Sequence, residues 1–125
     1  MERGTQAAHR HTVLIVDDDR PVRQLFADGL EPMGIAVHAA ASGEEALQVA
    51  AADARVCVVL ADVRMPRMDG WDLERQLRRL NPDLPVVLLS ADRQLAIRGS
   101  VRDKPVAPDD VAALVRSRCP HTRRS

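Results

Sequence analysis

Short apolar runs that alternate with segments of helical periodicity constrain the fold of this chain more than any other feature. The runs are Thr12–Val16, Ile35–Ala39, Val56–Ala61 and Pro85–Ser90. Their lengths are typical of buried strands. Strands that alternate with helices form right-handed βαβ units, which build a parallel sheet covered by helices on both faces. The sequence therefore predicts a doubly wound α/β domain, with residues 100–103 as a fifth, short strand.

The segments between these runs carry helical spacing and helix-terminal signals. We expect helices over 20–33, from 43 onward, over 71–80 and over 108–118. Ser42 and Glu45 have the spacing of a capping box at the start of the second helix. The apolar residues of each helix recur at helical intervals and are placed on one face. They include Leu25 in the first helix and Leu80 in the third.

Composition and charge exclude several classes of protein. Eighteen basic residues balance eighteen acidic ones, so there is no electrostatic footprint for nucleic acid or an anionic membrane. No apolar run is long enough to span a bilayer, and the N-terminus lacks the apolar region of a secretory signal. Cys57 and Cys119 do not form a disulfide framework. We therefore expect a cytoplasmic protein with no direct nucleic-acid partner and no membrane partner.

The length of the chain suits one domain. We expect residues 12–119 to form it, between a disordered tail of residues 1–11 and a C-terminal tail of residues 120–125. His9 and His11 have the spacing of metal ligands, but they lie in the predicted tail without other ligands. We therefore interpret both histidines as part of a disordered segment.

Polar residues follow four of the predicted strands: Asp17–Asp19, Asp62, Ser90 and Lys104. Because the carboxyl ends of parallel strands share one edge, these side chains are expected to converge. Carboxylates packed together repel one another and need a cation, and a purely oxygen ligand set favours Mg²⁺. A hydroxyl and an ammonium group suit the oxygens of a phosphoryl group. The pattern indicates a carboxylate that accepts a phosphoryl group beside Mg²⁺.

Four segments, LIVDDD, VLADVRMPRMDGWDL, VVLLSA and DKPV, occur in this order along the chain. Together they resemble the CheY-like receiver domain of two-component response regulators over residues 12–118. The MPxMDG pattern after the strand-end acid is the most specific part of this resemblance. The resemblance to receiver domains implies a flavodoxin-like, five-stranded parallel sheet with strand order 2-1-3-4-5.

The resemblance also implies a role for each strand-end residue. The implied site consists of the phosphoacceptor Asp62, the Mg²⁺ ligands Asp17, Asp18, Asp62 and the backbone carbonyl of Arg64, and the phosphoryl-binding side chains of Ser90 and Lys104. The peptide bond between Lys104 and Pro105 is usually cis in such domains. Asp19 is instead interpreted as an exposed acid at a helix N-terminus, where the helix dipole favours it.

Two features depart from the pattern of the family. Ser90 and Lys104 are fourteen positions apart, and residues 91–99 are fewer than the ~10–12 that a helical crossover needs. We therefore expect the helix between the fourth and fifth strands to be absent or reduced to about one turn, Gln94–Arg98. The family places an aromatic residue three positions before the lysine, where this chain has Val101. Both departures affect the face through which receivers signal rather than the acceptor itself.

Arg64 and Asp92 stand two residues beyond Asp62 and Ser90, at positions that tune aspartyl phosphate hydrolysis in the family. We hypothesise that the two side chains pair across the site and hinder the attacking water. The hypothesis predicts a phosphorylated protein that loses its phosphoryl group slowly, and faster in Arg64→Ala. An unchanged lifetime of the phosphoprotein in that variant would remove any such role for the pair.

The favoured function is a stand-alone receiver, phosphorylated by a sensor histidine kinase or a histidine phosphotransfer protein. It would signal to another protein as a monomer or weak homodimer, and it would catalyse its own phosphorylation and dephosphorylation without being a turnover enzyme. The alternative is a receiver-like binding module that acts without phosphorylation, which the short segment and Val101 favour. A haloacid-dehalogenase-type phosphatase, with Asp17 as nucleophile and Asp19 as acid, also fits the first motif, but the chain is too short for it.

Overall fold

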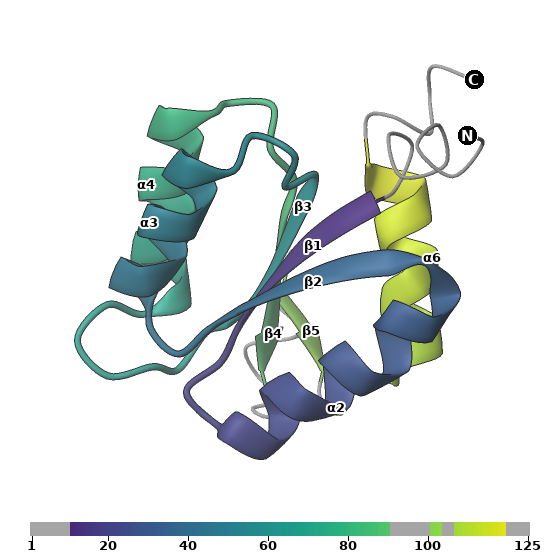
Figure 1. Cartoon of the computed structure of the whole chain (residues 1–125). Helices are drawn as coiled ribbons and strands as arrows, with labels where there is room; N and C mark the ends of the chain where they lie inside the picture. The colour runs from purple at the N-terminus through teal and green to yellow at the C-terminus, as the bar shows by residue number, and fades with distance from the viewer. Residues whose placement is uncertain (1–10, 91–100, 104–106, 120–125) are drawn as a thin grey trace.

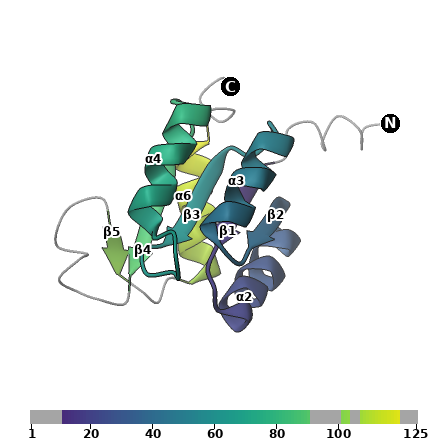
Figure 2. The ribbon, with the colours of Figure 1, turned by 90° about the vertical axis from the view of Figure 1, so that its left-hand side faces the viewer.

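A five-stranded parallel sheet forms the centre of the computed structural model, which describes residues 11–90, 101–103 and 107–119 (Figure 1). The strands are β1 (His11–Val16), β2 (Ile35–Ala40), β3 (Val58–Asp62), β4 (Val86–Ser90) and β5 (Val101–Asp103). Their order is β2-β1-β3-β4-β5, and every neighbouring pair is parallel. Figure 2 shows β5 and β2 at opposite edges of the sheet. The doubly wound fold and the strand order are as predicted.

Helices cover both faces of this sheet. They are α2 (Arg20–Leu30), α3 (Gly43–Ala52), α4 (Gly70–Leu80) and α6 (Pro108–Arg118). Helices α3 and α4 lie on one face, and α2 and α6 lie on the other (Figures 1 and 2). The predicted loss of a helix between β4 and β5, including the turn Gln94–Arg98, falls outside the described residues. Within the described part of the chain, no helix has the length and apolarity needed to cross a bilayer.

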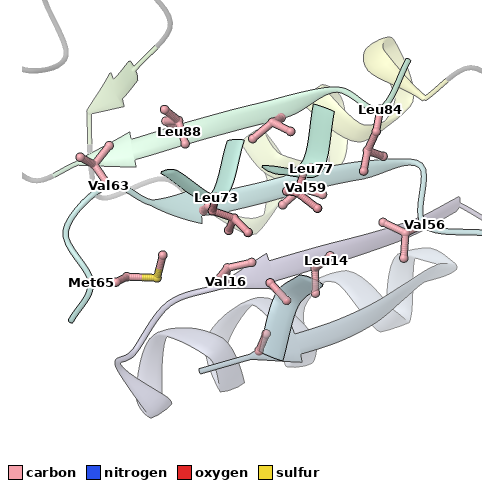
Figure 3. Close-up of a cluster of buried hydrophobic side chains, with 14 residues drawn as sticks. Leu14, Val16, Val56, Val59, Val63, Met65, Leu73, Leu77, Leu84 and Leu88 are labelled. Atoms are coloured by element: carbon pink, nitrogen blue, oxygen red, sulfur yellow. The ribbon is translucent and has the colours of Figure 1, made fainter. Parts of the chain in front are cut away.

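Each face of the sheet buries its own aliphatic core. Successive side chains of a strand point to opposite faces, so Val16 faces α3 and α4 whereas Ile15 faces α2 and α6. Figure 3 shows Leu73 and Leu77 of α4 against the first of these cores. Because both faces are covered, the strands appear in the sequence as continuous apolar runs rather than as alternating patterns.

The first helix is shorter than its apolar spacing predicts. Helix α2 ends at Leu30, and a 3₁₀ turn, η1 (Glu31–Met33), follows it. Pro32 has no N–H to donate, and its ring clashes with the preceding turn of an α-helix. Gly34 then adopts a left-handed conformation with φ of 83° and leads the chain into β2.

Leu25 and Leu80 were placed on apolar helix faces, but each is 54% exposed in the structure. Leu25 precedes Phe26, which occupies the buried side of α2. Leu80 is the last residue of α4 and lines an open hollow with Ala51 and Leu84, near the C-terminal ends of α3 and α4. Helical spacing gives the direction of a side chain, whereas the extent of the elements packed beneath it decides its burial.

The start of α3 confirms the predicted cap. The hydroxyl of Ser42 accepts a hydrogen bond from the backbone N–H of Glu45 at 3.1 Å. The reciprocal bond runs from the N–H of Ala41 to Glu45 Oε1 at 2.8 Å, one residue before the cap position. Two N–H groups at the helix start are therefore satisfied locally.

Candidate functional site

Three carboxylates meet at the carboxyl edge of the sheet. Val16 pairs with Ala61 between β1 and β3, so Asp17, directly after β1, lies beside Asp62 at the end of β3. One carboxylate oxygen from each of Asp17, Asp18 and Asp62 lies within 4.8 Å of the other two. Asp18 is exposed and Asp62 is partly buried. The structure thus brings together the three acids expected to converge there.

Asp17 is the anchored member of this group. Its side chain is buried, with 3% of the residue exposed, and its backbone N–H donates to the carbonyl of Ala40 at 3.1 Å. Asp17 Oδ1 accepts from the N–H of Asp19 at 2.9 Å, and the Arg23 guanidinium donates to the Asp17 carbonyl at 2.8 Å. Asp19 is itself exposed at the N-cap position of α2, as expected for a helix-terminal acid.

The chain beyond Asp62 turns back to support it. The N–H of Arg64 donates to Asp62 Oδ1 at 3.3 Å, and the N–H of Val63 donates to the carbonyl of Leu89 at 2.9 Å. The N–H of Gly70 then donates to the carbonyl of Val63 at 2.9 Å. These backbone bonds fix both ends of the loop that follows β3 and hold the Asp62 carboxylate at the sheet edge.

Helix α4 begins against the end of β3, and Gly70 permits this close approach. A Cβ atom at position 70 would lie 2.7 Å from the carbonyl oxygen of Asp62 and 2.8 Å from Cα of Val63. Glycine is the residue that lets two backbones come this near. Asp69 caps the helix, because its Oδ1 accepts from the N–H of Asp72 at 2.9 Å. The Asp-Gly pair of the motif therefore positions α4 directly behind Asp62.

Ser90 ends β4 on the same edge and is 1% exposed. Asp62 pairs with Leu89, the residue before Ser90, so the serine lies one position beyond the acid on the neighbouring strand. Ser90 pairs in turn with Asp103 of β5. Three other predicted site residues lie outside the described part of the chain: Asp92, Lys104 and Pro105. The position of the lysine, the cis bond and the arginine–aspartate pair therefore remain predictions.

The chemistry of this edge suits a hard divalent cation. The grouped donor atoms are all carboxylate oxygens, which Mg²⁺ prefers, and Mg²⁺ commonly keeps several waters where the protein supplies few ligands. Three carboxylates within 4.8 Å of one another repel, and a bound cation relieves that repulsion. The residues present therefore fit a magnesium ion.

A second group of polar side chains lies at the opposite, amino edge of the sheet. His11 is the first residue of β1 and pairs with Ile35, so its assignment to a disordered tail is wrong. His11, Cys57 and Cys119 each offer a ligand atom within 4.8 Å of the other two. Burial, and then the adjacent thiol of Cys119, raise the pKa of Cys57 to about 12. The sequence contained a signal for part of this group, because His11 and Cys57 stand at the amino ends of two predicted strands. The amino ends of parallel strands share one edge of the sheet, as the carboxyl ends do.

The amino-acid sequence also matches the model of a known protein family. The profile described as "Response regulator receiver domain" matches residues 13–112, most of the chain. The chain belongs to the response regulator receiver family. Receiver domains are signalling domains of two-component systems that act with histidine kinases or phosphotransfer proteins, and they are not conventional enzymes.

Curated relatives of this receiver domain are longer than the chain itself. It is 39% identical over 113 residues to the response regulator MprA of Mycolicibacterium vanbaalenii, and 38% identical over 113 residues to MprA of Mycobacterium ulcerans. Each alignment covers 84% of this chain and 48% of the relative. The chain thus spans about half the length of these relatives.

Solved receiver structures share the fold. The chemotaxis protein CheY4 of Vibrio cholerae matches with a TM-score of 0.74 and 27% identity, over 87% of this chain and 98% of that one. The response regulator TrrA of Thermotoga maritima, solved in complex with Mg²⁺-BeF, matches with a TM-score of 0.75 and 25% identity. That alignment covers 86% of this receiver domain and 97% of TrrA.

Proposed function

We propose that this receiver domain accepts a phosphoryl group on Asp62 in a Mg²⁺-dependent reaction and signals through contact with another protein. The donor is a sensor histidine kinase or a histidine phosphotransfer protein. The observation that carries the proposal is the meeting of three carboxylates from β1 and β3 within 4.8 Å. The likeness to TrrA, which was solved with Mg²⁺-BeF, supports the same chemistry. The domain works in the cytoplasm, as a monomer or a weak homodimer.

In this proposal the chain holds Mg²⁺ through the carboxylates of Asp17, Asp18 and Asp62 and the backbone carbonyl of Arg64. Bound there, Mg²⁺ neutralises charge on the acids and on the phosphoryl oxygens. Asp17 is buried and fixed by backbone hydrogen bonds, so it sets the position of the ion. Asp18 and Asp62 are more accessible than Asp17, and in the proposal they meet the incoming donor.

The transfer step uses Asp62 as the nucleophile. A carboxylate oxygen of Asp62 attacks the phosphorus atom and forms a new O–P bond, while the P–N bond to the donor histidine breaks. The departing imidazole keeps the electron pair of the broken bond. We assign the Ser90 hydroxyl as a hydrogen-bond donor to one phosphoryl oxygen and the Lys104 ammonium as the partner of another. In the same proposal Arg64 and Asp92 slow the later attack of water.

Labelling by a small phosphodonor tests this function without knowledge of the partner kinase. Purified protein is incubated with acetyl phosphate, with and without Mg²⁺, and its intact mass is measured. We expect one added phosphoryl group in the presence of Mg²⁺ and none after chelation, because the three carboxylates would repel the donor without the cation.

The absence of labelling with every donor tried would contradict the proposal. It would favour the other reading, a receiver-like module that binds its partner without phosphorylation. The specific observation behind that reading is Val101 at the start of β5, where the family places an aromatic residue. A pull-down with gene-neighbour proteins, in which Asp62→Asn binds as well as the unmodified protein, would then support it.

A further inference from the structure

The amino edge of the sheet carries a second cluster of ligand atoms, which the phosphoacceptor chemistry does not use. His11 begins β1, Cys57 stands directly before β3, and Cys119 is the C-cap residue of α6. Figure 1 shows β1 starting beside the C-terminal end of α6. Strand β3 separates the two sites, since its five residues span about 17 Å from Cys57 to Asp62.

The two thiols are held in place by the surrounding backbone. Cys57 is 5% exposed and Cys119 is completely buried, and both are free thiols. The carbonyl of Thr12 accepts from the N–H of Cys57 at 2.9 Å and from its thiol at 3.3 Å. The N–H of Cys119 donates to the carbonyl of Val115 at 2.9 Å, which fixes this residue to the last turn of α6. The two cysteines of the cluster therefore belong to the folded core and not to the exposed surface.

His11 adds a third ligand of a different type. Its Nδ1 atom is shielded from solvent, and a ligand atom of His11 lies within 4.8 Å of a sulfur atom from each cysteine. In tetrahedral zinc sites the metal lies about 2.3 Å from sulfur and about 2.0–2.1 Å from nitrogen, which places the ligand atoms roughly 3.5–3.8 Å apart. The observed upper limit of 4.8 Å between the ligand atoms is therefore close to the spacing that such a site requires.

We propose that His11, Cys57 and Cys119 form a binding site for a thiophilic divalent metal ion of the Zn²⁺ class. Each thiol loses its proton to solvent as its sulfur binds the metal, and the neutral imidazole of His11 donates a nitrogen lone pair. Two thiolates then balance the two positive charges of the ion, so the buried site carries no net charge. A water molecule or an exogenous ligand completes the tetrahedron.

Ligand type separates this site from the phosphoacceptor edge. Soft sulfur ligands select Zn²⁺-like ions, whereas the oxygen ligands of the three carboxylates select Mg²⁺. A disulfide between the two cysteines would leave the histidine without a role, and the presence of this third ligand favours the metal. The site would join the first residue of β1 to the last turn of α6, and so the two ends of the domain.

Titration of the reduced protein with Co²⁺ tests the proposal by absorption spectroscopy. We expect thiolate-to-cobalt absorption in the near ultraviolet and tetrahedral bands in the visible, saturating at one ion per chain and displaced by Zn²⁺. The double variant Cys57→Ala/Cys119→Ala is expected to lose both features. Removal of a residue that only hydrogen-bonds to a metal ligand typically weakens metal binding by about 10–100-fold. Because His11 is a ligand itself, His11→Gln should weaken Co²⁺ binding by about that factor or more.

His38→Gln is the matched control, because His38 contacts Asp53 at 2.8 Å and is not part of the cluster. It should bind Co²⁺ as the unmodified protein does, and His9 and His121 are retained in every variant. Native mass spectrometry of the unmodified protein with Zn²⁺ gives a readout independent of any variant's folding. The expected product is one zinc ion with two protons lost. The proposal is overturned if native mass spectrometry shows no such product, or if cobalt absorption persists in the double-cysteine variant. It is also overturned if the two cysteines oxidise to a disulfide and the protein takes up no metal.

Discussion

Asp62→Asn is expected to abolish labelling by acetyl phosphate. The amide of asparagine has almost the size of the carboxylate, and its oxygen can still accept from the N–H of Arg64, which lies 3.3 Å from Asp62 Oδ1. The amide is, however, a poor nucleophile and a weaker ligand for Mg²⁺. Intact mass after incubation with acetyl phosphate and Mg²⁺ measures the result, and the variant should show no added phosphoryl group under conditions that label the unmodified protein fully.

Asp69→Asn provides the matched control for this experiment. It makes the same chemical change in the loop that follows β3, at a residue that caps α4. Asparagine is as good an N-cap residue as aspartate, so α4 should stay in place and labelling should persist. Labelling of Asp62→Asn at the normal level would exclude Asp62 as the acceptor. If the variant turned over a phosphate ester instead, the phosphatase reading with Asp17 as nucleophile would be revived.

Gly70→Ala is expected to have the second largest effect, on both stability and labelling. The new Cβ would lie 2.7 Å from the carbonyl oxygen of Asp62, a backbone atom that cannot rotate away. Overpacking of this kind typically costs about 1–3 kcal/mol of unfolding free energy. Relief requires α4 to move away from the end of β3, which disturbs the loop that positions the Asp62 carboxylate. Urea denaturation measures the first effect, and the rate of acetyl phosphate labelling measures the second.

Gly29→Ala separates these two effects. A Cβ at position 29 would lie 2.5 Å from Cβ and Cγ of Pro108, at the contact between α2 and α6. We expect a loss of stability there as well, because the proline ring is rigid, but no change in the labelling rate of the folded protein. The close approach at Gly70 would have no functional importance if Gly70→Ala kept both the stability and the labelling rate of the unmodified protein.

Much of the phosphoacceptor edge could be predicted from the sequence, because parallel strands bring their carboxyl ends together. Asp17 and Asp62 each stand at the end of an apolar run, and the register of β1 with β3 places them side by side. Ser90 follows from the same rule, since β4 is the next strand across the sheet. The strand order itself depended on the resemblance to receivers, because an alternation of strands and helices is compatible with several orders.

Other features could not be predicted because they depend on packing between distant segments. Helical spacing placed Leu25 and Leu80 on apolar faces, yet spacing carries no information on where the supporting layer ends. The cluster at the amino edge forms because the C-terminal end of α6 lies beside the start of β1. This contact joins residues at opposite ends of the domain, and no local pattern in the sequence predicts it. A histidine before the first apolar run therefore looked like part of a tail.

The start of β1 and the end of α6 meet at the rim of the sheet opposite Asp62, and this arrangement decides where a tether can be attached to the protein. His11 and Cys119 both stand at that rim beside Cys57, and the five residues of β3 place Asp62 about 17 Å from Cys57. A tether attached through either end of the folded core therefore leaves from the side away from the phosphoacceptor. Surface immobilisation or fusion through such a tether is therefore expected to leave the edge that carries Asp62 accessible to other molecules.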